Sequence, residues 1–161
     1  MARFCARRAR NRSLLPLNLM VPVPPMPLVS RKSILALAAV IDVAVNAGNR
    51  PVSAKTLAAR QKLPPRHLEP VLQALVHDGI LKGIRGPRGG YELARGRGDI
   101  TAEDILRAAS AAEEAAEPPL PGTPLINRVV RPALSEAERM FSAALGRINV
   151  EDMARQAQAL K

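Results

Sequence analysis

The sequence predicts a mostly α-helical protein that carries one small β-hairpin. Apolar residues recur at helical spacing over much of the chain, and hydrophobic residues make up 47% of its 161 residues, enough to bury a core. Aromatic residues make up only 2%, so the core has to be aliphatic, which suits packed helices better than a β-sandwich. One short stretch, 80–94, has two apolar segments around a glycine-rich turn, which is typical of a hairpin.

Residues 1–30 are expected to form a flexible leader that is first basic and then proline-rich. They contain five arginines and no acidic residue, and their prolines preclude a continuous helix. Three interpretations stay open: an organellar transit peptide, a nucleic-acid-binding arm, or an over-extended start with Met20 or Met26 as the true first residue. The sequence therefore leaves open whether residues 1–25 are present in the mature protein.

Two helices are predicted next. The first covers 33–47 and is expected to end at Gly48, in the left-handed conformation. The second covers 54–61, with Ser53 as its N-cap and with Val52 and Leu57 as a hydrophobic staple. The apolar face expected for the first helix consists of Ile34, Leu37, Ala38, Ile41 and Val45.

A third helix is predicted over 65–78, after a turn at 63–65. Pro65 suits its first position, and Gly79 should end it. Pro70 removes one backbone hydrogen bond, so it should bend the first turns or confine regular structure to the segment after it. The residues expected to face inward are Leu68, Leu72, Leu75 and Val76.

Strands are predicted at 80–84 and 91–94, joined by a turn at 86–90. Thr101 should cap a fourth helix, with Glu103 and Asp104 in its first turn. This helix ends the first unit, 31–110, and an acidic linker is expected over 111–132. Helices then follow over 133–161, with a break near 146–149. The apolar positions expected are Ile105, Leu106 and Ala109 in the fourth helix, and Met140, Leu145, Ile148, Val150 and Met153 in the last region.

The order of these elements over 31–110 is that of a winged helix-turn-helix, which sets its second helix in the major groove of DNA. The first turn of that helix carries Arg66, His67 and Glu69; arginine can pair with guanine, and glutamate can accept from a cytosine amine. The hairpin is basic, which suits contacts to phosphate or to a narrow minor groove. Its cations are Lys82, Arg85 and Arg88, followed by Arg95 and Arg97. The complete candidate DNA-contact set is Ser53, Lys55, Lys62, Pro65, Arg66, His67, Glu69, Lys82, Arg85, Gly86, Arg88 and Gly89.

The formal net charge of +10 favours a polyanionic partner, and half of it lies outside the leader. An RNA- or ribosome-associated basic protein is the alternative that this charge and the pI near 11.2 permit. Readers of single-stranded RNA usually stack bases on aromatic side chains. The aromatic residues Phe4, Tyr91 and Phe141 form no such platform, so double-stranded DNA is the expected partner.

Catalysis is not expected. His67 and His77 lie ten residues apart on the predicted DNA-facing helix, with no convincing nucleophile beside either. The glycine-rich turn lacks the GK[ST] ending of a phosphate-binding loop. With Cys5 as the single cysteine, the chain cannot build a Cys-based metal or cluster site, so no metal and no cofactor are expected. A cytoplasmic setting fits, and no apolar run is long enough to predict a membrane span.

Residues 31–110 resemble the Rrf2 family of bacterial winged-helix transcriptional regulators, which includes the IscR, NsrR and CymR types. The resemblance is carried by SRKSILALAAVIDVAVNAG, by PVSAKTLAARQKLPPRHLEPVLQALVHDGILKGIRGPRGGYELAR and by DITAEDILRAAS. Its most specific part is RGPRGGYELAR in the hairpin. The closing MFSAALGRINVEDMARQA is similar to the dimerisation helix and the short terminal helix of the family.

This resemblance implies a homodimer that binds a palindromic operator and represses, or sometimes activates, transcription. It places Glu69 at the frequent recognition-helix acid of the family, and it matches Arg85, Gly86, Arg88, Gly89 and Gly90 to the wing. Many members hold an iron–sulfur cluster on three cysteines ahead of the dimerisation helix. Because 111–131 contains no cysteine, we expect a member without the cluster. Control by an unidentified small-molecule or protein effector, sensed through 110–135, is the alternative.

Overall fold

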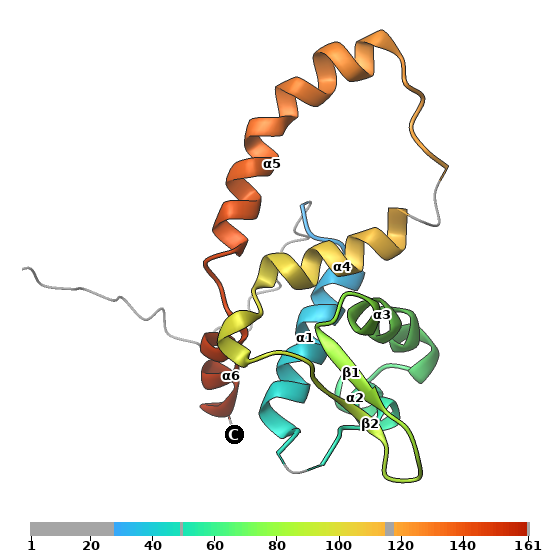
Figure 1. Ribbon diagram of the computed structural model, residues 1–161, viewed down its shortest axis with the longest axis vertical. Helices are drawn as coiled ribbons and strands as arrows, with labels where there is room; N and C mark the ends of the chain where they lie inside the picture. Colours follow the sequence, from blue (N-terminus) through green and yellow to red (C-terminus); the bar gives the residue numbers. More distant parts are fainter. Residues whose placement is uncertain (1–27, 49, 115–117, 161) are drawn as a thin grey trace, which may run out of the picture.

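The computed structural model describes residues 28–48, 50–114 and 118–160, and in this part of the chain a helical body carries one hairpin. A long helix stands away from that body (Figure 1). The elements are α1 (Arg31–Asn46), α2 (Ala54–Arg60), α3 (Pro65–His77), β1 (Leu81–Ile84), β2 (Gly90–Leu93), η1 (Arg97–Asp99), α4 (Ala102–Glu114), η2 (Ile126–Val130), α5 (Arg131–Leu145) and α6 (Val150–Gln158). None of the described helices is both long and apolar enough to cross a membrane. Residues 1–27 of the predicted leader, including Cys5, lie outside the described residues.

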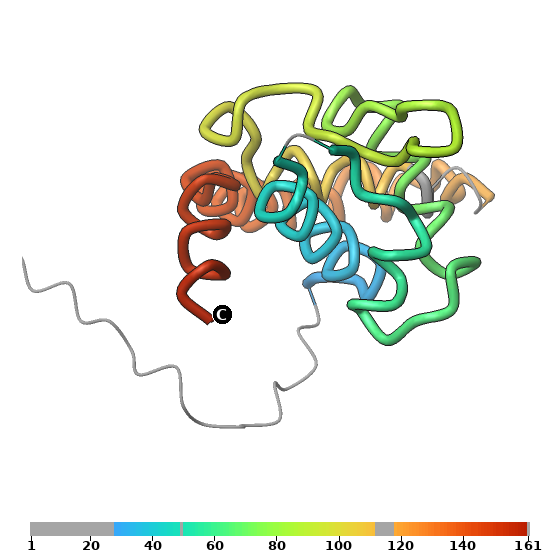
Figure 2. The backbone as a smooth tube through the Cα atoms, turned by 90° about the horizontal axis from the view of Figure 1, so that it is seen from below, coloured from blue at the N-terminus to red at the C-terminus, as the bar shows by residue number. Residues whose placement is uncertain are grey.

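Helix α1 lies in the middle of the body, with α3, α4, α6 and β2 around it (Figure 2). The predicted buried face of this helix was wrong, because Ile34 is 47% exposed and the other four predicted residues are only half-buried. The buried residues are mostly smaller ones: Ser33, Ala36, Ala39, Val40, Val43 and Ala44. A helix that is apolar around most of its circumference gives no single periodic face, and close neighbours on several sides favour small residues.

The left-handed conformation predicted for Gly48 was also wrong. Helix α1 ends at Ala47, whose N–H donates to the carbonyl of Val43 at 2.8 Å and whose φ of −81° and ψ of 74° already turn the chain out of the helix. Gly48 itself has no positive φ.

The turn between α2 and α3 contains a strained lysine. The N-cap predicted for α2 is confirmed, because the N–H of Thr56 donates to the hydroxyl of Ser53 at 3.1 Å. At the other end, Lys62 has a φ of +53°, and its N–H donates to the carbonyl of Ala59 at 3.1 Å. The N–H of Leu63 donates to the carbonyl of Ala58 at 2.9 Å, which completes a Schellman motif. The position after α2 therefore requires the left-handed region, which favours glycine, and lysine occupies it.

Helix α3 begins at Pro65 and continues through Pro70, so regular structure is not confined to the segment after Pro70. Pro70 is exposed, and buried leucines on the opposite side hold the helix against the body. Gly79 ends the helix as predicted, with a φ of +66°. The inward-facing set differs from the prediction at one position: Val71 is buried and Val76 is 37% exposed. The buried set is then Leu68, Val71, Leu72 and Leu75, the i, i+3, i+4, i+7 pattern of one helical face.

The hairpin is fixed to the segment that starts α2. Strands β1 and β2 pair antiparallel, with Leu81 opposite Leu93. On its other side β2 pairs with Val52, whose N–H donates to the carbonyl of Tyr91 at 3.0 Å and whose carbonyl accepts from the N–H of Tyr91 at 2.8 Å. A Cβ on Gly90 would lie 2.5 Å from the carbonyl oxygen of Val52, so this close approach requires glycine.

Helix α4 follows the predicted cap. The N–H of Asp104 donates to the hydroxyl of Thr101 at 3.2 Å, and the N–H of Thr101 donates to the carboxylate of Asp104 at 3.1 Å. The three apolar residues expected on its inner side, Ile105, Leu106 and Ala109, are buried.

Helical structure enters the predicted linker, 111–132, from both sides. Helix α4 continues to Glu114, and the chain is helical again from Pro124 through the π-helical turn η2 into α5. The linker prediction was therefore too long, because alanines favour continuation of α4 and the apolar residues after Pro124 extend the pattern of α5.

The predicted break near 146–149 is confirmed, since α5 ends at Leu145 and α6 begins at Val150. Two backbone hydrogen bonds join this break to the start of α4: from the N–H of Ala102 to Ile148 at 2.8 Å, and from the N–H of Val150 to Ile100 at 2.9 Å. Of the expected apolar positions, Val150 is buried, whereas Met140 and Ile148 are 61% and 43% exposed.

Candidate nucleic-acid interface

The first turn of α3 presents the polar side chains that the sequence placed there. Arg66, His67 and Glu69 are exposed, while Leu68 between them is fully buried. The helix begins without a side-chain cap at Pro64, so its first N–H groups are not covered by a capping side chain. This end of α3 therefore offers donors, cations and one carboxylate to a partner.

The start of α2 and the tip of the hairpin together line a shallow hollow of about 380 Å³. Ser53 and Arg88 both line it, as predicted members of the site, and the pairing of Val52 with Tyr91 holds the two elements together. The hydroxyl of Ser53 is already engaged by Thr56, so its main part is to start α2. The hollow also contains Arg50, Thr56 and Arg60, which the sequence reasoning missed. Two of them are arginines close in sequence to the Ser53 cap, and that clustering was the available signal.

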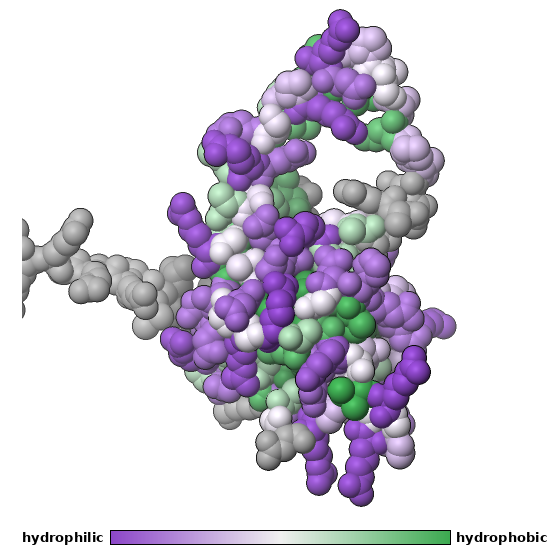
Figure 3. All heavy atoms as spheres, viewed as in Figure 1, coloured by the Kyte–Doolittle hydropathy of each residue, from purple (hydrophilic) through white to green (hydrophobic). Residues whose placement is uncertain are grey.

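The tip of the hairpin is a tight, cationic turn. Arg85 and Arg88 are exposed, and Gly86 has a φ of +115°. The N–H of Gly89 donates to the carbonyl of Gly86 at 2.9 Å, and a Cβ on Gly89 would overlap the carbonyl oxygen of Ile84. Gly89 thus shapes the turn that presents the two arginines. Hydrophilic side chains extend from this lower edge of the molecule (Figure 3).

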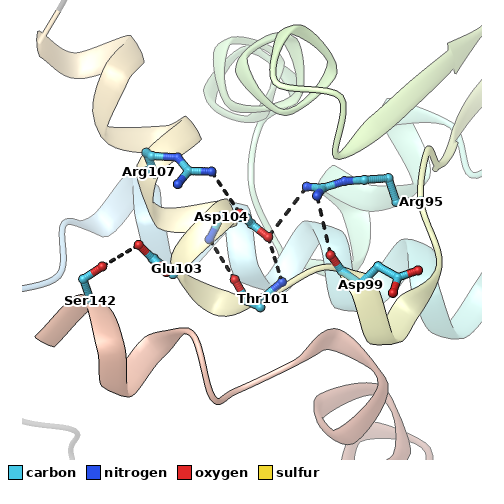
Figure 4. Close-up of polar contacts among 7 residues, drawn as sticks. All are labelled: Arg95, Asp99, Thr101, Glu103, Asp104, Arg107 and Ser142. Carbon is cyan, nitrogen blue, oxygen red and sulfur yellow. Dashed lines mark hydrogen bonds and ion pairs between the residues drawn. The ribbon is translucent and has the colours of Figure 1, made fainter. Parts of the chain in front are cut away.

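Three cations of the predicted wing are engaged within the protein. Lys82 pairs with Glu92 across the hairpin at 3.2 Å. Arg95 lies 3.7 Å from the carboxylate of Asp104 and donates to the carbonyl of Asp99 at 3.5 Å (Figure 4). Arg97 is half-buried against α1 and β2. Arg95 and Arg97 lie after β2, where the chain turns back towards the body, and not at the hairpin tip. That they contact DNA stays a prediction.

Asp104, the acid that pairs with Arg95, has a lowered pKa. Burial would raise the pKa of Asp104, but the N–H and hydroxyl of Thr101 and the guanidinium groups of Arg95 and Arg107 outweigh it and hold that pKa below its ordinary value. The arginine is thus part of a structural cluster at the start of α4, shown in Figure 4.

The start of α1 contributes two cations that the sequence reasoning did not assign to the site. Arg31 and Lys32 line a second hollow, of about 480 Å³, together with His67 of α3. No sequence pattern connects residues 31 and 67; only the packing of α1 against α3 does. The remaining predicted members, Lys55, Lys62 and Pro65, are exposed.

These features define a winged helix-turn-helix protein: a short helix, a tight turn, a second helix with an exposed polar first turn, and a cationic hairpin. The Rrf2 family, described as iron-dependent transcriptional regulators, matches residues 29–156. The chain belongs to this family of helix-turn-helix transcriptional regulators.

Individual relatives agree with the family. The chain is 37% identical over 79 residues to the regulator CymR of Bacillus subtilis, covering 49% of this chain and 57% of CymR. It is 39% identical over 87 residues to a helix-turn-helix-type regulator of Synechocystis, covering 54% of this chain and 57% of that relative. The aligned part thus spans about half the length of these curated relatives.

Solved structures match over a longer part of the chain. IscR of T. potens has a TM-score of 0.63 and 31% identity, covering 83% of this chain and 90% of IscR. CymR of B. subtilis has a TM-score of 0.59 and 28% identity, covering 80% of this chain and 96% of CymR. These structures confirm the winged-helix fold predicted from the sequence.

The iron in the family's description raises the question of ligands. An iron–sulfur cluster needs several thiolates, and the whole sequence holds one cysteine, Cys5. Among the residues that the structure describes, no group of three or more His, Cys, Asp or Glu side chains could hold a metal ion. The donor set of this chain does not fit such a cluster.

Proposed function

We propose that this protein is a cytoplasmic, sequence-specific transcriptional regulator that binds a palindromic DNA operator as a homodimer and represses transcription. The observation that carries the proposal is the exposed polar first turn of α3, which is packed in the same unit as the cationic hairpin tip. A helix of this kind fits the major groove, and arginines at a hairpin tip suit phosphate or the minor groove.

The homodimer is supported by an apolar seam along the outer helix. The seam consists of Leu134, Ala137, Phe141 and Ala144, which follow one another at alternating steps of three and four residues within α5. This is the spacing of a coiled-coil interface. Leu134 is 53% exposed, and Ala137 and Ala144 are exposed as well, so this face has room for a partner helix. A second copy of the same helix is the partner that the heptad spacing favours.

Regulation without a resident cluster and without catalysis completes the proposal. The presence of only one cysteine in the sequence supports regulation without a cluster. The family and its relatives are described as transcriptional regulators, which supports a role without catalysis. A small molecule or protein sensed near 110–135 remains the proposed source of the signal. Iron–sulfur absorption in anaerobically purified protein would contradict a cluster-free regulator.

The test is selection of bound duplex DNA by the purified protein in moderate salt. We expect one palindromic motif, with half-sites about one helical turn apart. Duplex DNA should also compete for the protein better than single-stranded RNA does. Binding without any motif, or preferential competition by RNA, would contradict the proposal and favour a non-specific nucleic-acid binder.

Glu69→Ala tests whether α3 reads bases. We expect the variant to lose preference at one or two base pairs of each half-site, at a cost of about 1–3 kcal/mol in discrimination, because a glutamate accepts from a cytosine amine. Motif selection with both proteins measures this. Glu136→Ala, on exposed α5, is the control and should select the wild-type motif. Identical motifs for Glu69→Ala and wild type would remove Glu69 from base reading.

A further inference from the structure

The first turn of α4 contacts two parts of the molecule through adjacent acidic residues. Asp104 binds Arg95, which follows the hairpin. Glu103, one residue earlier, accepts a hydrogen bond from the hydroxyl of Ser142 on α5 (Figure 4). The two carboxylates therefore connect the region behind the wing with the outer helix through one helical turn.

The carboxylate of Glu103 also lies close to Gly146 at the end of α5. A Cβ on Gly146 would lie 3.2 Å from the carboxylate of Glu103, tighter than an ordinary contact. Glu103 thus fits between Ser142 and Gly146, which are one helical turn apart and share one side of α5. The apolar seam at Leu134, Ala137 and Phe141 lies about 80–140° around the helix from Ser142, on a different side. The latch, meaning Glu103, Ser142 and Gly146, therefore leaves the seam unobstructed.

Two backbone hydrogen bonds between 100–102 and 148–150 also join the start of α4 to this junction. They hold the chain at the break that follows α5, from Ile148 to Val150, and so fix a pivot. A second contact, made by a residue within α5, is needed to fix the direction in which this helix leaves the pivot. The latch supplies such a contact, one turn inside the helix.

We propose that Glu103 is a positioning residue that sets the direction of α5 relative to the winged helix-turn-helix, and thereby the spacing of operator half-sites that the dimer accepts. This inference rests on the proposed function. Helix α5 has 15 residues and is about 22 Å long, so a change of direction by about 10° moves its far end by about 4 Å. That displacement is comparable to the rise of one base pair, about 3.4 Å.

The experiment measures spacing with the full chain. Wild type, Glu103→Ala and Ser142→Ala are each allowed to select from duplex libraries in which two fixed half-sites are separated by every spacer of a graded series. Wild type should prefer one spacer. In both variants the preference for that spacer over its neighbours should fall by about five- to tenfold, which corresponds to the loss of one hydrogen bond worth about 1–1.4 kcal/mol. The sequence of each half-site should stay unchanged.

Conservative variants and a matched control show whether an altered spacing preference comes from the direction of α5 or from a loss of folding stability. Glu103→Gln and Ser142→Thr keep an acceptor and a hydroxyl, and both should retain the spacing preference. Ser135→Ala removes a hydroxyl from the same helix, one that bonds only the carbonyl of Pro132 at 2.9 Å, and should also retain it. Thermal unfolding and dimer mass are recorded for each protein, because a merely structural role would lower stability without altering spacing.

The outcomes are distinguishable. An unchanged spacing profile in Ser142→Ala, whose side chain lies on the outer helix, would overturn the positioning role while the proposed function stands. If wild type selects half-sites with no preferred spacer or remains a monomer, the proposed function itself is contradicted. Restored preference in Ser142→Thr alongside relaxed preference in Ser142→Ala would support the latch.

Discussion

Lys62 has a left-handed backbone conformation, with a φ of +53°, which a residue with a side chain disfavours. A non-glycine residue in the left-handed region costs about 1–2 kcal/mol. Nothing in the sequence marks this cost, because the turn after α2 has no glycine and lysine is otherwise a good helix residue. The Schellman hydrogen bonds at Ala58 and Ala59 reveal it.

Lys62→Gly should therefore raise the free energy of unfolding by about 1 kcal/mol while weakening DNA binding, because strain is relieved and one exposed cation is lost. Chemical denaturation and binding titrations at several salt concentrations measure both effects. Lys55→Gly, in the first turn of α2 where the backbone is helical and glycine relieves no strain, is the matched control and should not raise stability. A Lys62→Gly protein no more stable than wild type would contradict the strain.

Gly90 is the residue on which the attachment of the wing depends. Gly90→Ala should lower the free energy of unfolding by about 1–3 kcal/mol, because its Cβ would overlap the backbone at Val52 and Ser53. DNA binding should fall too as β2 moves. Gly83→Ala in the facing strand is the control: no atom lies within 4 Å of its Cβ position, so it should change stability little. Equal effects of the two substitutions in thermal unfolding would contradict the steric argument.

At the scale of the elements, the sequence predicted helices and strands well where local chemistry decides. Ser53, Thr101 and Gly79 are capping signals that act within a few residues, and each lies where predicted. The buried face of α1 and the return of Arg95 to the body depend on neighbours distant in sequence, so no local pattern contains them. The same holds for Arg31 beside His67.

The capping turn of α4 gives a prediction on pH. Asp104→Asn should lower stability by about 1 kcal/mol at pH 7, because the charged cap is lost. Folding lowers the pKa of Asp104, so its stabilisation is complete above the unfolded-state value of about 3.9 and is lost as pH falls through the lower folded value. The difference between variant and wild type should therefore shrink below pH about 4.

Urea unfolding across this pH range measures the difference. Asp78→Asn serves as the control, since Asp78 is exposed at the end of α3, and it should be nearly neutral throughout. A stability loss in Asp104→Asn that stays constant down to pH about 3 would indicate that the charge is not what stabilises the turn.

At the scale of the whole molecule, α5 is a long helix in which no residue is buried within the monomer. Ala137→Glu places a charge in the apolar seam and should weaken dimerisation by at least about 100-fold, because an unpaired charge in an interface is strongly destabilising. Binding to a full operator should weaken with it. Analytical ultracentrifugation and operator titration measure the two effects.

Ser135→Glu introduces the same charge two residues away on the opposite side of α5, and it should remain dimeric. Both variants should keep the unfolding profile of the winged domain, since α5 is exposed along this stretch. A dimeric Ala137→Glu protein would exclude this seam as the subunit contact.

The pairing of Val52 with Tyr91 has a thermodynamic consequence for recognition. Because the hairpin is anchored in the free protein, no conformational entropy has to be lost at that element when a duplex is bound. Preorganisation of this kind predicts a heat-capacity change on association that matches the apolar surface buried at the interface alone, without the larger negative contribution of a segment that folds upon binding.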